Sequence, residues 1–165
     1  MSKISVKVNQ PSLKSIVKNV NAPKYTQEIG KVIVREMLNS IARGISPVRN
    51  ERRFVKYSDG YSRAIRKQYK SITDYSSSKK VRPVNLNLSG QMLRALTYKS
   101  RRGALQIGIF TSDMAKRAKK HQLGLDGVPR RRFIPAQNGE ELTVSIMRQL
   151  KNEYVKIIDS IIKSS

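Results

Sequence analysis

Apolar residues recur at every third or fourth position in two long stretches of the chain, a spacing that places them on one face of an α-helix. The first stretch spans about 23–43, and Gly44 follows it, a residue favoured just past the end of a helix. The second begins near Asn138, which has Glu141 three residues later, the spacing of a capping box. The two stripes are Tyr25, Ile29, Val32, Ile33, Met37 and Ile41, and then Leu142, Ile146, Leu150, Tyr154, Ile157, Ile158 and Ile161. We therefore predict one long helix near the N-terminus and a second that closes the chain.

Two predicted strands lie in the second half of the chain. Residues 97–100 and 104–110 are expected to pair antiparallel across a tight turn, because Gly103 can adopt the positive φ that such turns need. The remaining expected elements are a strand over 4–8, helices over 11–20, 59–72, 92–96 and 112–122, and an extended, edge-strand segment over 128–135. This mixture of helices and antiparallel strands predicts an α+β fold, and 165 residues suit a single domain over 1–165.

Residues 73–85, with the sequence TDYSSSKKVRPVN, are rich in serine and in basic residues. Such a composition is typical of a flexible, solvated loop, which is our prediction for this segment. Hydrophobic residues make up 38% of the chain, below the roughly 45–50% of an average domain, a figure that also counts glycine. We therefore expect a thin core and much surface left for solvent or for a partner.

The chain is strongly basic, with a formal net charge of +23. The charge is spread over residues 1–139, whereas residues 140–165 carry four basic and four acidic side chains and are neutral. A basic body indicates an anionic partner, because self-repulsion otherwise opposes compaction. The residues that we predict to contact nucleic acid or an acidic partner are Arg101, Arg102, Lys116, Arg117, Lys119, Lys120, Arg130, Arg131 and Arg132. Such contacts would be led by phosphates and would discriminate poorly between sequences.

Side chains suited to catalysis are scarce. The sequence has no cysteine and one histidine, His121, which excludes disulfides, cysteine-bound metals and cysteine nucleophiles. We interpret His121 as a structural or interfacial residue, since a triad or a metal site needs companions. Glu140 and Glu141 are interpreted as acids in the first turn of the last helix, where they complement its dipole. We expect no catalytic residue, no cofactor and no metal.

Four short motifs follow one another between Leu88 and Pro135. They are Leu88-Ser89-Gly90 with Leu93-Arg94, then Ile107-Gly108, then Ala118 with His121-Gln122-Leu123-Gly124, and finally Pro129, Arg131, Phe133 and Ile134. In this order and spacing the chain resembles the phage virion-morphogenesis family of small tail-completion and neck proteins. The resemblance implies structural roles for Gly90, Leu93, Gly108, His121, Gln122, Gly124, Pro129 and Phe133. The chain departs from the family pattern at Arg117, Arg130 and Arg132, each of which adds positive charge.

The resemblance also implies an architecture and partners. The architecture is a small antiparallel sheet packed by the long N-terminal helix, with the closing C-terminal amphipathic helix beside them. The expected protein forms a homo-oligomeric ring, a hexamer or a dodecamer, and contacts phage connector, neck and tail proteins and packaged double-stranded DNA. The neutral C-terminal helix is the best candidate for packing on a neighbouring subunit. Neck adaptor, tail terminator and tail-completion roles remain open at this point.

The alternative function is a nucleic-acid-binding protein without sequence specificity, of the ribosomal or nucleoid kind, and an enzyme is the least favoured class.

No run of about 18 apolar residues indicates a membrane span, and the N-terminus lacks the apolar region of a signal peptide. We therefore expect a protein made in the host cytoplasm that ends in the virion, at the head–tail interface, without a membrane partner.

Overall fold

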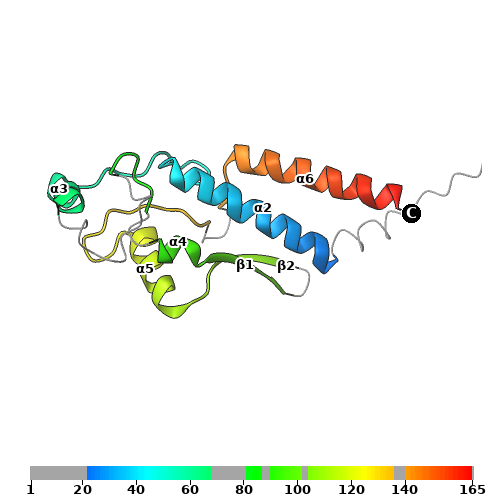
Figure 1. Cartoon of the computed structure of the whole chain (residues 1–165), viewed down its shortest axis with the longest axis horizontal. Helices are drawn as coiled ribbons and strands as arrows, with labels where there is room; N and C mark the ends of the chain where they lie inside the picture. Colours follow the sequence, from blue (N-terminus) through cyan, green and yellow to red (C-terminus); the bar gives the residue numbers. More distant parts are fainter. Residues whose placement is uncertain (1–21, 68–80, 87–89, 102–103, 136–139, 165) are drawn as a thin grey trace, which may run out of the picture.

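A computed structural model describes residues 22–67, 81–86, 90–101, 104–135 and 140–164 (Figure 1). The elements are α2 (Pro23–Ala42), α3 (Asp59–Lys67), α4 (Gln91–Arg94), β1 (Leu96–Arg101), β2 (Ala104–Ile109), α5 (Ser112–Leu123) and α6 (Val144–Lys163). The strand predicted over 4–8 and the helix predicted over 11–20 lie outside the described residues.

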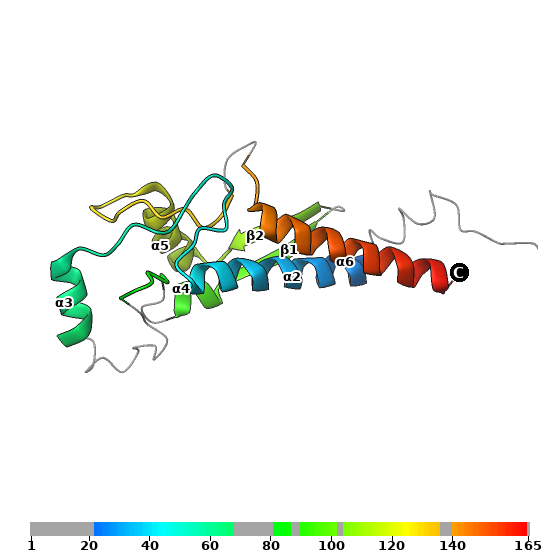
Figure 2. The same ribbon diagram turned by 90° about the horizontal axis from the view of Figure 1, so that it is seen from above.

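Helix α2 lies between the β1–β2 hairpin and helix α6, to which it runs antiparallel (Figures 1 and 2). Its predicted stripe faces both neighbours, because Ile33 and Met37 are buried in one cluster with Leu96 of the hairpin and Ile157 of α6. The helix ends where Gly44 adopts a φ of +74°, as its position after the stripe predicted. The predicted α+β architecture, a small antiparallel sheet packed by the long N-terminal helix and accompanied by a C-terminal helix, is confirmed.

The hairpin pairs Leu96 with Ile109 and continues to Arg101 opposite Ala104. Side chains on one face of the hairpin pack toward α2, and that contact requires a glycine. A Cβ placed on Gly30 would lie 2.5 Å from atoms of the Tyr98 ring, closer than carbon atoms approach without repulsion. Helix α2 can therefore sit directly on the ring only because position 30 has no side chain.

A second hydrophobic cluster lies beyond the hairpin and gathers loops around α4 and α5. Its buried members are Ile41, Phe54, Val84, Leu86, Met92, Leu93, Ala118 and Phe133. Leu38, Ile109 and Ile134 pack against both clusters, so the two parts of the core are continuous. Phe133, with no exposed surface, anchors the segment that follows α5.

The edge strand predicted over 128–135 is absent, because residues 128–135 pair with no strand. Instead of a strand, the side chain of Gln122 binds part of their backbone, at Phe133 and Ile134. Helix α6 also begins later than predicted, at Val144 instead of near residue 139. Glu140 and Glu141 thus precede the helix, and the capping role proposed for them is wrong; Asn138 lies outside the described residues.

The late start of α6 has a tertiary cause. The chain before it docks on the loop after α2: the N–H of Arg49 donates to the carbonyl of Glu141 at 2.7 Å, and the N–H of Thr143 donates to that of Pro47 at 2.9 Å. Leu142 forms an isolated bridge with Val48 between these bonds. A backbone held in this extended pairing cannot also form a helical turn.

The predicted flexible loop over 73–85 is described only at its end. Residues 81–84 form a turn, and Val84, Asn85 and Leu86 are buried, so this end packs into the core instead of standing in solvent. Val84 and Leu86 contribute to the cluster around α4 and α5. Residues 73–80 lie outside the described residues.

Candidate functional site

Helix α5 and the segment after it are joined through one buried side chain, that of Gln122. Its Oε1 accepts hydrogen bonds from the N–H groups of Phe133 at 3.0 Å and Ile134 at 3.3 Å, and its Nε2 donates to the carbonyl of Ile134. The N–H of Arg131 adds a bond of 2.7 Å to the carbonyl of His121. These bonds satisfy buried backbone groups that a β-ladder would otherwise satisfy. They hold the segment against the C-terminal half of α5.

Two of the three motif glycines, Gly90 and Gly124, stand where the backbone is left-handed. Gly90, with a φ of +78°, precedes α4, and Gly124, with a φ of +72°, ends α5. A Cβ on Gly124 would also lie 3.0 Å from the Cβ of Arg130. Both positions favour glycine, since other residues seldom adopt such φ values. Of the other motif residues, Leu93, Gly108 and Phe133 are buried, His121 is half-buried, and Pro129 is exposed.

Arg131, predicted as a surface contact, is 3% exposed. Its Nε donates to the carbonyl of Val55 at 3.0 Å, and its guanidinium lies 4.8 Å from the centre of the Tyr57 ring. Burial lowers the pKa of this guanidinium, and the neighbouring tyrosines oppose that shift. Arg131 therefore helps to position loop 44–58 and does not belong to the exposed cationic surface.

The two neighbours of Arg131 differ from it and from each other. Arg132 has a side chain that is 14% exposed and forms ion pairs with Glu51 and Glu140. Arg130 is mostly exposed and lies 3.7 Å from a carboxylate oxygen of Glu51. Of these three consecutive arginines, only Arg130 can offer its guanidinium to a large partner.

Most of the exposed cations of the predicted contact surface lie on α5. Lys116, Arg117 and Lys119 are exposed, and none of them has a carboxylate within ion-pair distance among the described residues. Lys120 is exposed as well but pairs with Asp126 at 2.8 Å. This part of the predicted surface is thus a short cationic row along one helix.

The other predicted contacts are not part of this row. Arg101 is the last residue of β1, and Figure 1 shows that β1 ends on the side of the structure away from α5. Arg102 lies outside the described residues. The structure therefore brings together the α5 cations and Arg130, and separates Arg101 from them.

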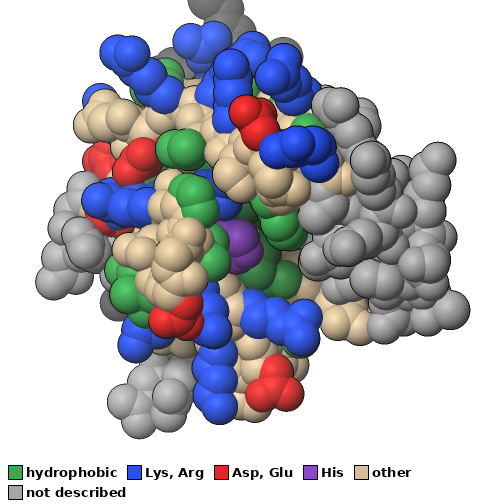
Figure 3. Space-filling view, turned by 90° about the vertical axis from the view of Figure 1, so that its left-hand side faces the viewer, with side chains coloured by type: hydrophobic (Ala, Val, Ile, Leu, Met, Phe, Trp, Pro, Cys, Tyr) green, Lys and Arg blue, Asp and Glu red, His purple; other side chains and the backbone are tan. Residues whose placement is uncertain are grey.

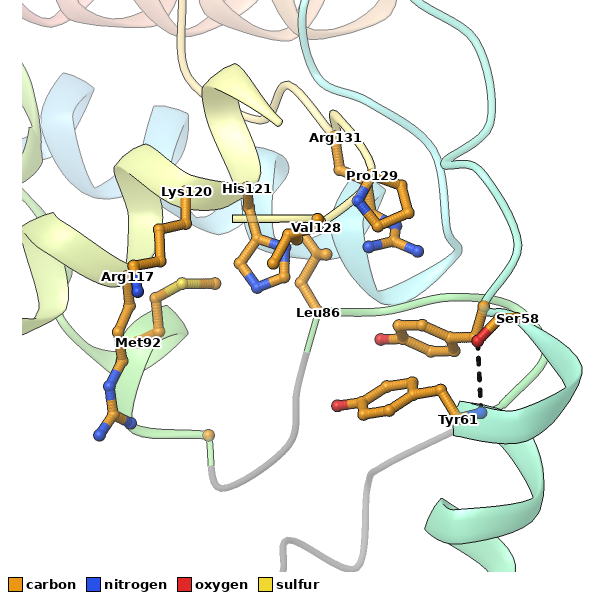
Figure 4. A pocket seen from close by; sticks show the side chains of 13 residues that line it. Ser58, Tyr61, Leu86, Met92, Arg117, Lys120, His121, Val128, Pro129 and Arg131 are labelled. Carbon is orange, nitrogen blue, oxygen red and sulfur yellow. Dashed lines mark hydrogen bonds between the residues drawn. The ribbon is translucent and has the colours of Figure 1, made fainter. Parts of the chain in front are cut away.

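A pocket of about 470 Å³ opens beside the α5 row, at the end of the domain that carries α3. Figure 3 shows this end: the side chain of the only histidine lies in a hollow, with apolar and basic side chains around it. His121 and Met92 line the side of the pocket next to α5, Tyr61 of α3 lines the other side, and Arg131 lies above Tyr61 in the view of Figure 4. The sequence pattern did not reveal this pocket, because its walls come from four separate segments.

Two tyrosines form the wall opposite α5. The rings of Tyr57 and Tyr61 lie 5.0 Å apart between centroids, at an interplanar angle of 60°. Burial raises the pKa of the Tyr57 hydroxyl to about 12, although the Arg131 cation opposes the shift. Tyr57 and Tyr61 are four residues apart across the start of α3. This spacing is the one feature of the sequence that indicates a contact between the two rings.

Helix α6 carries a second surface with potential to bind a partner. Ile146, Ile157 and Ile161 face α2 and are buried. A different face of the same helix exposes five apolar side chains, 37% to 59% accessible: Val144, Met147, Tyr154, Val155 and Ile162. At 100° per residue these five positions lie within about one third of the helix circumference. We call them the α6 stripe.

The described residues contain no group of three or more His, Cys, Asp or Glu side chains placed to hold a metal ion. Within the same part of the chain, no helix is both long and apolar enough to span a bilayer. The side chains that converge at the pocket and on α5 are cations, aromatic rings and apolar groups. Their chemistry is that of anion recognition.

Comparison of the chain with protein-family models, with curated proteins and with solved structures yields no match.

Proposed function

We propose that this chain is a structural protein of a tailed-phage virion, which forms a ring at the head–tail junction through which DNA passes. The proposal is supported by the resemblance of residues 88–135 to the virion-morphogenesis family and by two surfaces of opposite character. One is the α6 stripe, apolar and set in a neutral part of the chain; the other is the cationic row on α5.

The α6 stripe is the observation that carries the proposal. Copies with a net charge of +23 repel one another, so they can pack closely only through a surface of low charge. Residues 140–165 are neutral, and the stripe presents apolar area along a helix of 20 residues. Such a helix is about 30 Å long, enough to span a subunit contact.

The test is a pair of α6 variants that add the same charge to different faces. Val155→Asp places a carboxylate in the stripe, and Asn152→Asp places one on the polar face of the helix. We expect the unmodified chain and Asn152→Asp to form rings, seen by light scattering after size exclusion and by particle imaging, and Val155→Asp to remain monomeric. A chain that is monomeric and absent from finished particles, or rings that tolerate Val155→Asp, would contradict the proposal.

The second candidate is a nucleic-acid-binding protein without sequence specificity, favoured by the net charge and by the α5 row. It predicts tight binding to naked duplex in the monomer, with a steep salt dependence. Reversing Lys116, Arg117 and Lys119 to Glu would then flatten the slope of log K against log salt by up to about 2.7, roughly 0.9 for each phosphate contact. If the same reversals left duplex affinity unchanged and blocked particle assembly, this candidate would fail.

A further inference from the structure

The pocket beside α5 contains a buried positive charge. Arg131 is 3% exposed, and no carboxylate of the described residues lies within ion-pair distance of it. Its contacts are the carbonyls of Val55 and Lys56, at 3.0 and 3.4 Å, and the Tyr57 ring. Carbonyl dipoles and a ring stabilise the guanidinium, yet its full charge remains in a region where water screens it poorly.

The other charged groups around the pocket have the same sign. Arg117 and Lys120 line it on the α5 side, and none of the described residues that line it is an Asp or a Glu. Asp126 reaches Lys120 but does not line the pocket. Clefts lined by charges of one sign concentrate the opposite ion. This charge pattern favours an anionic group in the pocket.

Apart from Ser58 and His121, the rest of the described lining is mainly apolar or aromatic. Leu86, Met92 and Val128 face the cavity together with the two tyrosines, and Figure 4 shows Leu86 and Val128 between His121 and Tyr61. With a volume of about 470 Å³, the cavity lies in the lower half of the usual range for ligand pockets and is large enough for a bulky side chain and the backbone beside it.

The tyrosines do not form a platform for nucleic-acid bases. Stacked bases need open ring faces, whereas Tyr57 has the Arg131 guanidinium 4.8 Å from its ring centre. Tyr61 meets Tyr57 at 60°, close to edge-on, so the two rings offer no parallel pair of faces. This geometry favours a compact side chain over a base.

We propose that this pocket binds an acidic, apolar peptide segment of another protein, with an aromatic or large aliphatic side chain on the Leu86, Met92 and Val128 surface and flanking carboxylates, one toward Arg131 and one toward Arg117. The inference concerns a different surface from the α6 stripe and does not rest on ring formation. Ring assembly and peptide binding can therefore fail separately.

The probes are three blocked pentapeptides and one oligonucleotide. The first peptide is Gly-Asp-Phe-Asp-Gly; the second replaces both Asp by Asn, and the third replaces Phe by Ala. The oligonucleotide is a thymidine tetranucleotide. Binding is followed on the full chain through the methyl signal of Met92 in NMR, which reports contact inside the pocket. We expect the first peptide to shift this signal at concentrations where the other three probes have little effect.

Matched variants on α5 test the electrostatic part. Arg117 lines the pocket, whereas Lys116 is its exposed neighbour and does not. We expect Arg117→Gln to weaken binding of the acidic peptide about fivefold to tenfold, as loss of a charge-assisted contact does, and Lys116→Gln to change it less than twofold. Arg117 is exposed, so its replacement leaves the fold intact, unlike a change at Arg131.

Several results would overturn the proposal. Equal shifts by the Asp and Asn peptides would show that no anion is recognised, and equal shifts by the Phe and Ala peptides would show that the apolar surface is unused. A stronger shift of Met92 by the tetranucleotide would assign the pocket to nucleic acid. If Arg117→Gln and Lys116→Gln weakened binding of the acidic peptide equally, the overall charge of the protein, and not a contact in the pocket, would explain the binding.

Discussion

Replacing Gln122 by methionine tests how the segment after α5 is held. Methionine has nearly the same length and volume, so it fills the space but removes all three hydrogen bonds of the amide. The change leaves the N–H of Phe133 without its acceptor in the core, and it also removes the partners of the Ile134 N–H and carbonyl. The packing of Phe133 is otherwise unchanged.

The magnitude follows from the burial of the groups that lose a partner. Phe133 is fully buried, and an unsatisfied buried donor costs about 1–3 kcal/mol. Ile134 is half-buried, so water can replace part of its two bonds, and each contributes about 0.5–1 kcal/mol. We expect Gln122→Met to lower the free energy of unfolding by about 3 kcal/mol, which lowers Tm by roughly 6–12 °C in a chain of this size.

The assay is thermal and urea unfolding followed by circular dichroism, with Gln149→Met as the control. Gln149 is an exposed residue of α6, so the same chemical change should alter stability by less than about 0.5 kcal/mol. If Gln122→Met were no more destabilising than Gln149→Met, the amide would not be what holds residues 131–134. The account of the missing edge strand would then be refuted.

Two further predictions concern stability. Gly30→Ala should lower the free energy of unfolding by roughly 1–3 kcal/mol, because its new methyl group meets the Tyr98 ring. Gly60→Ala has no atom near the new methyl group, so it should leave the free energy of unfolding unchanged or raise it by up to about 1 kcal/mol. Equal effects of the two changes in thermal melts would contradict the close contact at Gly30. The pKa of Tyr57 is raised to about 12 in the folded protein, so the folded state favours the neutral hydroxyl. The stability that depends on this neutral form is fully present below the pKa of the unfolded chain, near 10. This contribution to the free energy of unfolding, roughly 2–3 kcal/mol, is lost as pH rises from 10 to 12. Between pH 9 and 12, the free energy of unfolding should therefore fall less in Tyr57→Phe than in the unmodified protein. An equal fall in both proteins would contradict the raised pKa of Tyr57.

The elements that the sequence predicted well are those decided by local spacing. Helix α2 follows from one uninterrupted apolar stripe and from Gly44, whose φ of +74° suits only a glycine well. The hairpin follows from two short strands around a glycine-containing turn. In both cases neighbouring residues interact mainly with one another, so the pattern contains the information that forms the element.

The predictions that failed concern segments held by distant partners. The sequence predicts an extended edge strand over 128–135, but the side chain of Gln122 binds the backbone of Phe133 and Ile134. Glu141 has the spacing of a helix cap, but its carbonyl accepts a bond from Arg49, 92 positions earlier in the chain. Neither partner is visible in the local pattern.

Arg130, Arg131 and Arg132 show the same difference between what the local sequence determines and what distant residues determine. The sequence by itself determined that the chain is strongly basic, that residues 140–165 are neutral, and that α5 carries a row of cations. Only the tertiary structure decided that Arg130 is exposed, Arg131 buried and Arg132 ion-paired. The physical reason is that a side chain's solvation and partners depend on what packs over it, and here that is a loop about 75 residues away in the chain.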